Sequence, residues 1–333
     1  MALMDRNTQS DALAVFDRAD LPREPVAQWL AGDDTVSGDY RADADKFSQR
    51  WSKGAELLAR LPGKPARSQA QAAAAAAIVE RDRAARAAFL DVHVEAIYRR
   101  LTADFTKFKR VETLVSDAAA ALPGLVPDHN QLSRDNALLQ KDKDGFEIDQ
   151  GFFLSRVLAD PRCGMHLCHA MLLPRPEAGE YSHRFRQSGK IELAGATLER
   201  RGKAAQVTMR NPRYLNAEDE ATLDGLEIAI DVATLDSATE IAILRGDVVE
   251  HTKYRGRRLF SAGINLTHLY QGKIGLVWYI KRDMGLVNKL FRGVAAREGT
   301  PDELNGATTE KPWIGVVEGF AIGGGCQLLL ALD

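Results

Sequence analysis

The sequence predicts two structural parts, a helical N-terminal domain over 1–188 followed by an α/β domain over 189–333. Strong helix formers dominate the first part, where an alanine-rich run that begins at Ser68 continues without Gly or Pro as far as Phe105. Near residue 190 the pattern changes to short apolar strands that alternate with amphipathic helices, which is typical of α/β folds. The 333 residues suffice for two domains of ~100–200 residues each.

Composition and charge exclude several classes of protein. Charged residues make up 27% of the chain and the formal net charge is -2, which excludes a globally basic nucleic-acid binder. No apolar run reaches the ~18 residues that a membrane-spanning helix needs, and the early acids of the N-terminus do not fit a secretion signal. The three cysteines, Cys163, Cys168 and Cys326, do not suggest a disulfide framework. We therefore expect a cytoplasmic protein that binds neither nucleic acid nor membranes.

Helix breakers divide the first part of the chain. Pro62-Gly63 and Pro123-Gly124 are expected to separate successive helices. The run of six alanines between them indicates close helix–helix packing rather than a flexible tether, because apolar residues such as Phe89 and Ile97 continue the helical pattern.

Five strands are expected in the second part, one of them directly before the turn at Ser261. Ile191–Leu198 and Ala205–Met209 alternate like strands, and Ile241–Leu244 is a short apolar strand. The last segment, which begins at Ile314, is interpreted as a buried strand, a turn of three glycines and an apolar helix.

Two longer helices lie between those strands. Asn216 is the predicted N-cap of the first, and the acids at 218–220 suit the positive end of its dipole. Arg282 lies in the second helix, outside its apolar stripe, and a polar loop is expected over 299–311. The stripe recurs at helical spacing and predicts one buried face, made of Leu276, Ile280, Met284, Val287 and Phe291.

Two glycine-containing turns carry the strongest functional signal. One follows a short strand and contains Ser261-Ala-Gly263, and the other is the triplet Gly323–Gly325. Each places a bare backbone amide beside a cavity, because glycine has no side chain to block a close approach. Two amides aimed at one point form an oxyanion hole, which stabilises charge that develops on a carbonyl oxygen. We expect the second turn to open a helix at Gly325.

These turns resemble the two oxyanion turns of the crotonase, or enoyl-CoA hydratase/isomerase, superfamily. FSAGINL at 260–266 is similar to the first and EGFAIGGGCQLLLALD at 318–333 to the second, and 207–217 resembles the family's first strand and turn. The resemblance covers about 191–333 and implies a crotonase-type core of ββα repeats. It also implies that further core residues would follow Asp333.

The resemblance implies roles for individual residues. The oxyanion donors would be the amides of Ile264 and Gly324. Gln327 stands where many crotonases have the glutamate that serves as acid or base in hydration. An amide does not accept a proton at neutral pH, although it donates and accepts hydrogen bonds. The alternative is that Gln327 only fills a polar space. Glu218 and Arg282 are expected to reach polar groups on the acyl part of the substrate, with a helix-dipole carboxylate and a surface arginine as the alternatives.

A basic and aromatic segment precedes the first oxyanion turn. CoA carries phosphates and an adenine, which suit cationic and aromatic side chains. The resemblance therefore implies that His251, Lys253, Tyr254 and Ala262 bind CoA, and a solvated basic hairpin stays the alternative. No metal is expected, because four ligands within seven residues do not easily wrap one tetrahedral ion; the residues are Cys163, His166, Cys168 and His169.

A long helical domain before such a core, with Gln327 in place of the glutamate, resembles one branch of the superfamily. Members of that branch, in glycopeptide-antibiotic pathways, oxidise 3,5-dihydroxyphenylacetyl-CoA with O2 to 3,5-dihydroxyphenylglyoxylate and CoA. The resemblance implies a dioxygenase without metal or cofactor that acts through a thioester enolate, and a trimeric or hexameric homo-oligomer. An ordinary crotonase (hydratase, isomerase or thioesterase) and a non-catalytic CoA-binding scaffold remain open.

Overall fold

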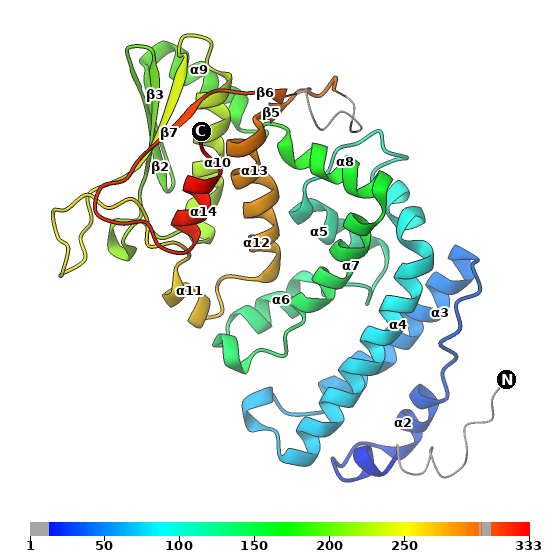
Figure 1. Cartoon of the computed structure of the whole chain (residues 1–333). Coiled ribbons are helices and arrows are strands. Elements are labelled where there is room, and N and C mark those ends of the chain that lie inside the picture. The colour runs from blue at the N-terminus through cyan, green and yellow to red at the C-terminus, as the bar shows by residue number, and fades with distance from the viewer. Residues whose placement is uncertain (1–12, 300, 302–307) are drawn as a thin grey trace. The chain divides into compact units, whose positions relative to one another are not determined.

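The computed structural model (Figure 1) describes most of the chain, namely residues 13–299, 301 and 308–333. These residues form two compact units, each of which draws on two segments of the sequence. The first consists of the described residues up to Lys107 and of Thr113–Cys163, and the second of Phe108–Glu112 and the described residues from Gly164 onward. The domain boundary at 188–189 stays a prediction, and the second unit also takes in the helix α9 that precedes it.

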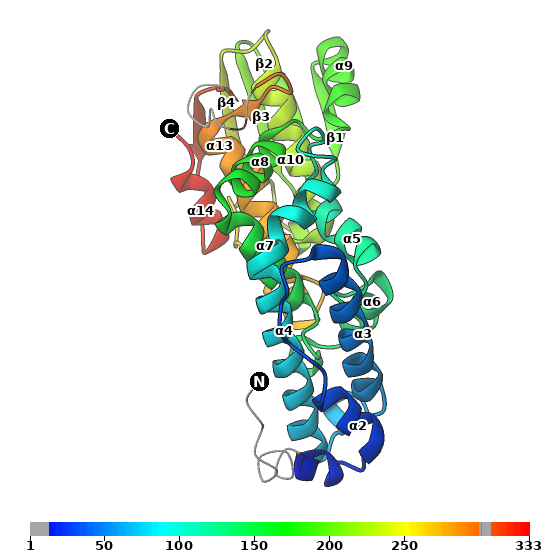
Figure 2. The ribbon, with the colours of Figure 1, turned by 90° about the vertical axis from the view of Figure 1, so that its right-hand side faces the viewer.

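The first unit is helical, as predicted. Its longest helix begins after Ser68, whose side chain accepts a hydrogen bond from the amide of Gln71, while the Gln71 side chain returns a bond to the Ser68 amide. Ala74 and Ala75 of the alanine run are buried against neighbouring apolar residues, which confirms a packing role. Figure 2 shows α3 and α4 side by side. The helices are α2 (Arg23–Leu30), α3 (Tyr40–Ala59), α4 (Gln69–Leu101), α5 (Val111–Ala121), α6 (His129–Asn136) and α7 (Glu147–Ala159).

The second unit contains a five-stranded sheet in the order β1-β2-β3-β4-β7. The first three strands are antiparallel neighbours, and β4 and β7 join in parallel. Helices α8 and α9 precede the sheet. The bounds are α8 (Pro161–Leu172), α9 (Ala178–Ser188), β1 (Lys190–Leu193), β2 (Ala196–Arg201), β3 (Ala204–Met209), β4 (Ile241–Gly246) and β7 (Trp313–Val316).

Three expectations about the strands are wrong in detail. The single strand expected over 191–198 is a hairpin, because Gly195 at φ +77° reverses the chain between β1 and β2. A Cβ there would lie 2.5 Å from the Cα of Thr222. The last strand is not buried, since Ile314 is 49% exposed on what is the edge strand of this sheet. Part of the polar loop expected over 299–311 lies outside the described residues, and Thr308–Thr309 forms β6, which pairs with β5 (Val294–Ala295).

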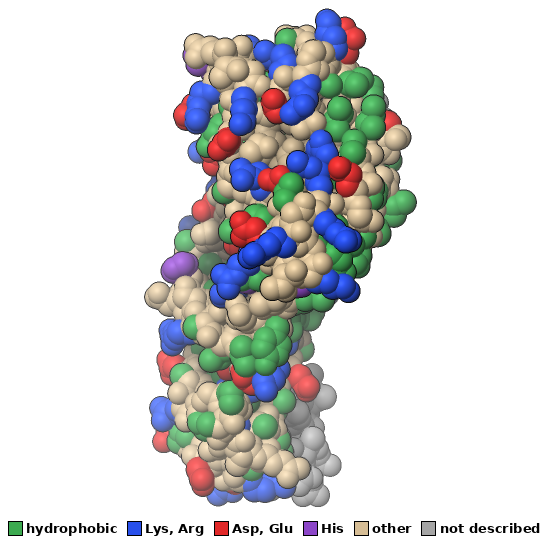
Figure 3. Space-filling view, turned by 90° about the vertical axis from the view of Figure 1, so that its left-hand side faces the viewer, with side chains coloured by type: hydrophobic (Ala, Val, Ile, Leu, Met, Phe, Trp, Pro, Cys, Tyr) green, Lys and Arg blue, Asp and Glu red, His purple; other side chains and the backbone are tan. Residues whose placement is uncertain are grey.

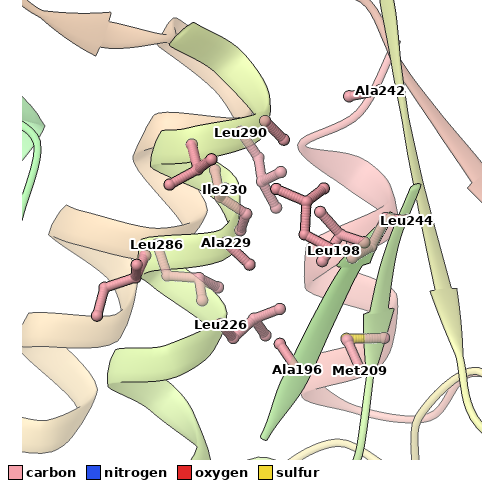
Figure 4. Packing of buried hydrophobic residues seen from close by; sticks show 14 of the residues in the cluster. Ala196, Leu198, Met209, Leu226, Ala229, Ile230, Ala242, Leu244, Leu286 and Leu290 are labelled. Carbon is pink, nitrogen blue, oxygen red and sulfur yellow. The ribbon is translucent and has the colours of Figure 1, made fainter. Parts of the chain in front are cut away.

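Helix α10 (Glu220–Leu235) packs on the sheet and forms the centre of the core. Figure 4 shows its residues Leu226, Ala229 and Ile230 facing Leu198 and Leu244 of the strands. The predicted N-cap at Asn216 is wrong. Asp219 caps the helix instead, because its side chain accepts from the amide of Ala221.

The predicted stripe of the second long helix is also wrong. This helix comprises α12 (Leu276–Lys281), a π-helical segment over Arg282–Val287 and α13 (Asn288–Arg292). Phe291, the last residue of the stripe, is 66% exposed. The buried face carries other apolar residues, Trp278, Leu286 and Leu290, together with cations. Lys289, fully buried, lies 2.8 Å from Glu227 and 2.7 Å from Asp231 of α10. Acidic partners on α10 thus allow a buried cation beside the apolar residues of the inner face.

Candidate active site

Three segments far apart in sequence meet at the two oxyanion turns. Ser261 pairs with Ala321 in a short parallel bridge, and Glu218 pairs in the same way with Ile264. The amide of Ile322 donates to the carbonyl of Ser261 at 3.0 Å. The backbone therefore holds the turn at 261–265 against both the start of α10 and the glycine triplet.

Hydrogen bonding in the first turn leaves one amide unused. The amides of Ala262, Gly263 and Asn265 donate to Leu215 O at 3.1 Å, Ser261 Oγ at 2.9 Å and Glu218 O at 2.8 Å. The amide of Ile264 has no acceptor among the described residues. A backbone donor without a partner is uncommon in a folded protein, and it points to a ligand oxygen.

The second turn repeats this arrangement. The amides of Gly325 and Cys326 donate to Ile322 O and Gly323 O, both at 2.9 Å, whereas those of Gly323 and Gly324 have no acceptor within the described part of the chain. Gly324 begins α14 (Gly324–Leu330), one residue earlier than expected. The two turns touch, since a Cβ on Gly263, at φ +84°, would lie 2.8 Å from the nitrogen of Gly324. Two unused donors on adjacent turns meet the requirement of an oxyanion hole.

Glu218 and Arg282 form a buried ion pair beside the second donor. Arg282 Nε and one terminal nitrogen donate to the two carboxylate oxygens at 2.8 and 2.9 Å, and the residues are 1% and 3% exposed for Arg282 and Glu218. Burial alone would lower the pKa of the Arg282 guanidinium. The hydrogen bonds to Glu218 and the charge of that carboxylate outweigh the effect of burial and raise the pKa of Arg282. Both groups lie next to Gly324, where a Cβ would be 3.1 Å from each.

Arg282 uses all five of its N–H donors within the protein. Besides Glu218, it donates to Asp283 at 2.8 Å, to Gln327 Oε1 at 2.9 Å and to the carbonyl of Gly324 at 3.0 Å. The surface-arginine alternative is therefore wrong. Because the Gln327 oxygen is occupied, its NH2 group is left as the free end of this exposed side chain. The predicted contacts of these residues with substrate stay predictions.

The predicted CoA-binding residues lie on a basic hairpin. His251 and Lys253 are exposed, and the Lys253 ammonium lies 5.1 Å from the Tyr254 ring centre. That ring packs edge-on against Phe320 at 5.5 Å, immediately before the second turn. The basic hairpin is the yellow loop that projects to the left in Figure 1. Figure 3 views the molecule from that side and shows Lys and Arg side chains with acidic side chains between them. Ala262 lies within the first turn, two residues before Ile264, and the CoA contacts of all four residues stay predictions.

The suggested metal ligands do not form a site. Across the described ranges, no three His, Cys, Asp or Glu side chains are placed to hold one metal ion. His166 and His169 instead flank the Phe108 ring, at 4.7 and 4.9 Å between centroids. Burial raises the pKa of the Cys163 thiol well above its ordinary value. Within the same described ranges, no helix combines the length and apolar character of a membrane span.

Two supporting residues were missed by the sequence reasoning. Ser261, fully buried, accepts from the amide of Gly263 and donates to the carbonyl of Asn216. Asp219 accepts from Asn265 at 2.9 Å and from Asn211 at 3.0 Å, which ties the first turn to the start of α10. A serine two residues before a glycine turn is a usable signal for the first, because serine often bonds to nearby backbone.

Comparisons with known proteins show what this chain is similar to. A curated (3,5-dihydroxyphenyl)acetyl-CoA 1,2-dioxygenase from Amycolatopsis orientalis is 43% identical over 296 residues, which cover 89% of this chain and 66% of that protein. A short-chain-enoyl-CoA hydratase from Clostridium acetobutylicum is 32% identical over 144 residues, or 43% of this chain and 46% of that protein. The chain thus spans about two thirds of the dioxygenase and under half of the hydratase.

Solved structures give a partial match. That of a probable enoyl-CoA hydratase/isomerase from Mycobacterium abscessus is 27% identical, with a TM-score of 0.30, and the match covers 43% of this chain and 44% of that one. No protein-family model matches the chain.

Proposed function

We propose, because this chain belongs to the crotonase (enoyl-CoA hydratase/isomerase) superfamily, that it is a dioxygenase for 3,5-dihydroxyphenylacetyl-CoA. The products would be 3,5-dihydroxyphenylglyoxylate and CoA. The likeness to a dioxygenase extends over 89% of the chain, against 43% for the hydratase. The observation that carries the chemistry is the pair of unused amides at Ile264 and Gly324.

The first step would be formation of an enolate. The two amides would donate to the thioester oxygen, so that removal of a proton from the adjacent carbon places negative charge where both donors point. The aryl ring delocalises this charge further. Preorganised donors of this kind need no rearrangement during the step, which is why each contributes strongly.

The second step would transfer electrons from the carbanion to O2, one at a time, with formation of a carbon–oxygen bond. The resulting peroxide would attack the thioester carbonyl and displace CoA as the thiolate, which takes up a proton, as the C–S bond breaks. Loss of the remaining α-proton to solvent would then form the α-carbonyl group as the O–O bond breaks. Both oxygen atoms of O2 enter the glyoxylate, and one of the two original α-hydrogens appears on the thiol. The substrate supplies all the electrons, so the scheme requires neither a metal nor an organic cofactor.

Side chains around the donors would orient the substrate. Gln327 presents its NH2 group beside the second turn, where it would donate to the thioester or the peroxide. Glu218 would accept from a ring hydroxyl, and Arg282 would exchange one of its present partners for the other hydroxyl. His251, Lys253, Tyr254 and Ala262 would hold CoA at the adjoining edge.

An oxygen-electrode measurement tests the proposal. The full chain, stripped of metals, is mixed with 3,5-dihydroxyphenylacetyl-CoA in air-saturated buffer. Oxygen consumption matched one to one by CoA release supports the dioxygenase. Hydration of crotonyl-CoA without oxygen consumption would identify an ordinary crotonase, and no turnover of any acyl-CoA would leave a binding scaffold. We further propose that the enzyme is a cytoplasmic homo-oligomer of a glycopeptide-antibiotic pathway.

A further inference from the structure

We infer that Ser261 is a positioning residue that sets the geometry of the oxyanion hole; this inference rests on the proposed function. Ser261 touches no part of the expected substrate position through its hydroxyl, because that hydroxyl is fully buried and occupied on both sides. It acts through the two turns that carry the donors.

The hydroxyl decides which amide of the first turn is available. Its oxygen accepts from Gly263 N at 2.9 Å and its proton goes to the carbonyl of Asn216 at 3.0 Å. With Gly263 engaged, Ile264 is the one member of the turn 262–265 whose amide lacks an acceptor among the described residues. Without the hydroxyl, the buried amide of Gly263 would lose its acceptor, which costs free energy and favours rotation of the peptide.

The same residue also fixes the second turn. Its carbonyl accepts from Ile322 at 3.0 Å, and a Cβ on Gly325 would lie 3.0 Å from the Ser261 Cβ. Gly324, the second donor, lies between those two contacts in sequence. One buried side chain and its own backbone therefore join both donors, so that their separation depends on Ser261.

Two variants and one control test this role. Ser261→Ala removes the hydroxyl, and Ser261→Cys keeps the volume with a weaker donor and acceptor. Thr102→Val is the matched control, since that hydroxyl is equally buried, donates to Tyr98 O at 2.7 Å and accepts from Phe105 N at 3.2 Å, all within the helical unit. Thermal melts of all three establish that folded protein is compared.

Turnover should separate the variants from the control. We expect Ser261→Ala to lower kcat about 10- to 100-fold, below the roughly 10²–10³ of a donor lost outright, because the amides remain but point less accurately. KM should stay within a few-fold, since CoA contacts lie elsewhere. Ser261→Cys should fall between wild type and alanine. Thr102→Val should lose stability without loss of kcat.

The deciding measurement is the infrared carbonyl frequency of bound arylacetyl-CoA, labelled with ¹³C at the thioester and studied without oxygen. An oxyanion hole polarises the carbonyl, so the wild-type frequency should lie below that of free ligand. Ser261→Ala should move it back toward the free value, and Thr102→Val should not. An unchanged shift in Ser261→Ala would overturn the inference. A normal wild-type shift that depends on Ser261, but without oxygen consumption in air, would refute the dioxygenase and uphold the role of Ser261.

Discussion

Ile264 and Gly324 are proposed to act through backbone atoms. The neighbours of Ile264 in the turn 262–265 all have acceptors for their amides, and Gly324 is followed by two bonded amides. Glu218, Arg282 and Gln327 then form one connected group beside Gly324, with the guanidinium of Arg282 at its centre. Removal of one partner from a buried pair of this kind typically costs about 3–5 kcal/mol, because the other charge remains without compensation. Substitutions at these positions therefore need a stability control.

The oxyanion donor at Gly324 is testable by Gly324→Pro. Proline has no N–H and is tolerated at the first position of a helix, which Gly324 occupies in α14. We expect kcat in the oxygen assay to fall about 10²- to 10³-fold, with KM little changed. Gly324→Ala is the control for added bulk, because it keeps the N–H. Wild-type oxygen consumption by folded Gly324→Pro protein would contradict the oxyanion assignment.

Much of the site could be predicted from sequence, because glycine turns and their spacing leave a local trace. The turns at 261–263 and 323–325 lie together as expected, and Arg282 joins Gln327 to Gly324, whereas the catalytic roles stay predictions. The engagement of Arg282 could not be predicted, since a cation outside an apolar stripe is ordinarily exposed. Its burial depends on Glu218, which is 64 residues away in sequence. Pairings over such distances leave no periodic signal.

At the level of elements, the predicted helices and strands were wrong where a buried charge or a turn interrupted the periodic pattern of apolar residues. The π-helical segment between α12 and α13 places Lys289 against two acids of α10, and the predicted stripe therefore missed the inner face. The hairpin of β1 and β2 was missed because a two-residue turn at Ala194-Gly195 leaves the alternation of apolar residues nearly unbroken. Helices with caps and breakers, such as α4, were predicted well.

The β1–β2 hairpin gives a prediction with an internal control. Gly195 and Gly202 both have positive φ, but a Cβ on Gly195 would lie 2.5 Å from Thr222 Cα while one on Gly202 meets nothing within 4 Å. Gly202→Ala should lower the free energy of unfolding by about 1–2 kcal/mol, because alanine must adopt a left-handed backbone conformation there. Gly195→Ala should cost clearly more, because α10 must also move. Urea unfolding of both variants measures this, and equal losses would argue against close packing of the turn on α10.

Asp82 of α4 should give the helical unit a pH dependence. Burial raises its pKa to about 6, against about 3.9 in an unfolded chain. The folded state thus binds this proton more tightly than the unfolded chain does. The contribution of the proton to folding stability is therefore complete below about pH 4 and is lost as the pH rises through 6. The free energy of unfolding of Asp82→Asn, measured in urea, should therefore rise relative to that of wild type by roughly 1–3 kcal/mol between pH 4 and 7. A gap that stays constant with pH would show that Asp82 does not titrate in this range.

At the scale of the whole molecule, the described chain combines a helical unit with an α/β unit that holds the donors. The closest contacts around the site all lie within the second unit, as do the hairpin and the ion pairs of α10. These contacts give the helical unit no direct part in the site, so its contribution to activity has to be measured on the full chain.

Removal of metals should leave turnover intact. In the proposed chemistry the amides of Ile264 and Gly324 supply the stabilisation that a Lewis acid would otherwise provide. Protein dialysed against strong chelators is expected to keep its kcat, and elemental analysis should find less than one metal per chain. Loss of activity that one specific ion restores would contradict cofactor independence.

Assembly is predicted from membership of the crotonase superfamily. We expect sedimentation velocity at micromolar concentration to show a trimer or hexamer, with an apparent melting temperature that rises with protein concentration. A monomer under these conditions would refute the expectation.

The backbone origin of the two donors imposes opposite constraints on sequence drift. Every residue except proline supplies the same N–H at position 264, so one apolar side chain can replace another there, through evolution or in a randomised library, while the donor persists and the packing against the core is kept. Position 324 has no such freedom, because any Cβ would crowd Glu218 and Arg282 at 3.1 Å. New substrate preferences are therefore expected to arise through changes at 264, with glycine retained at 324.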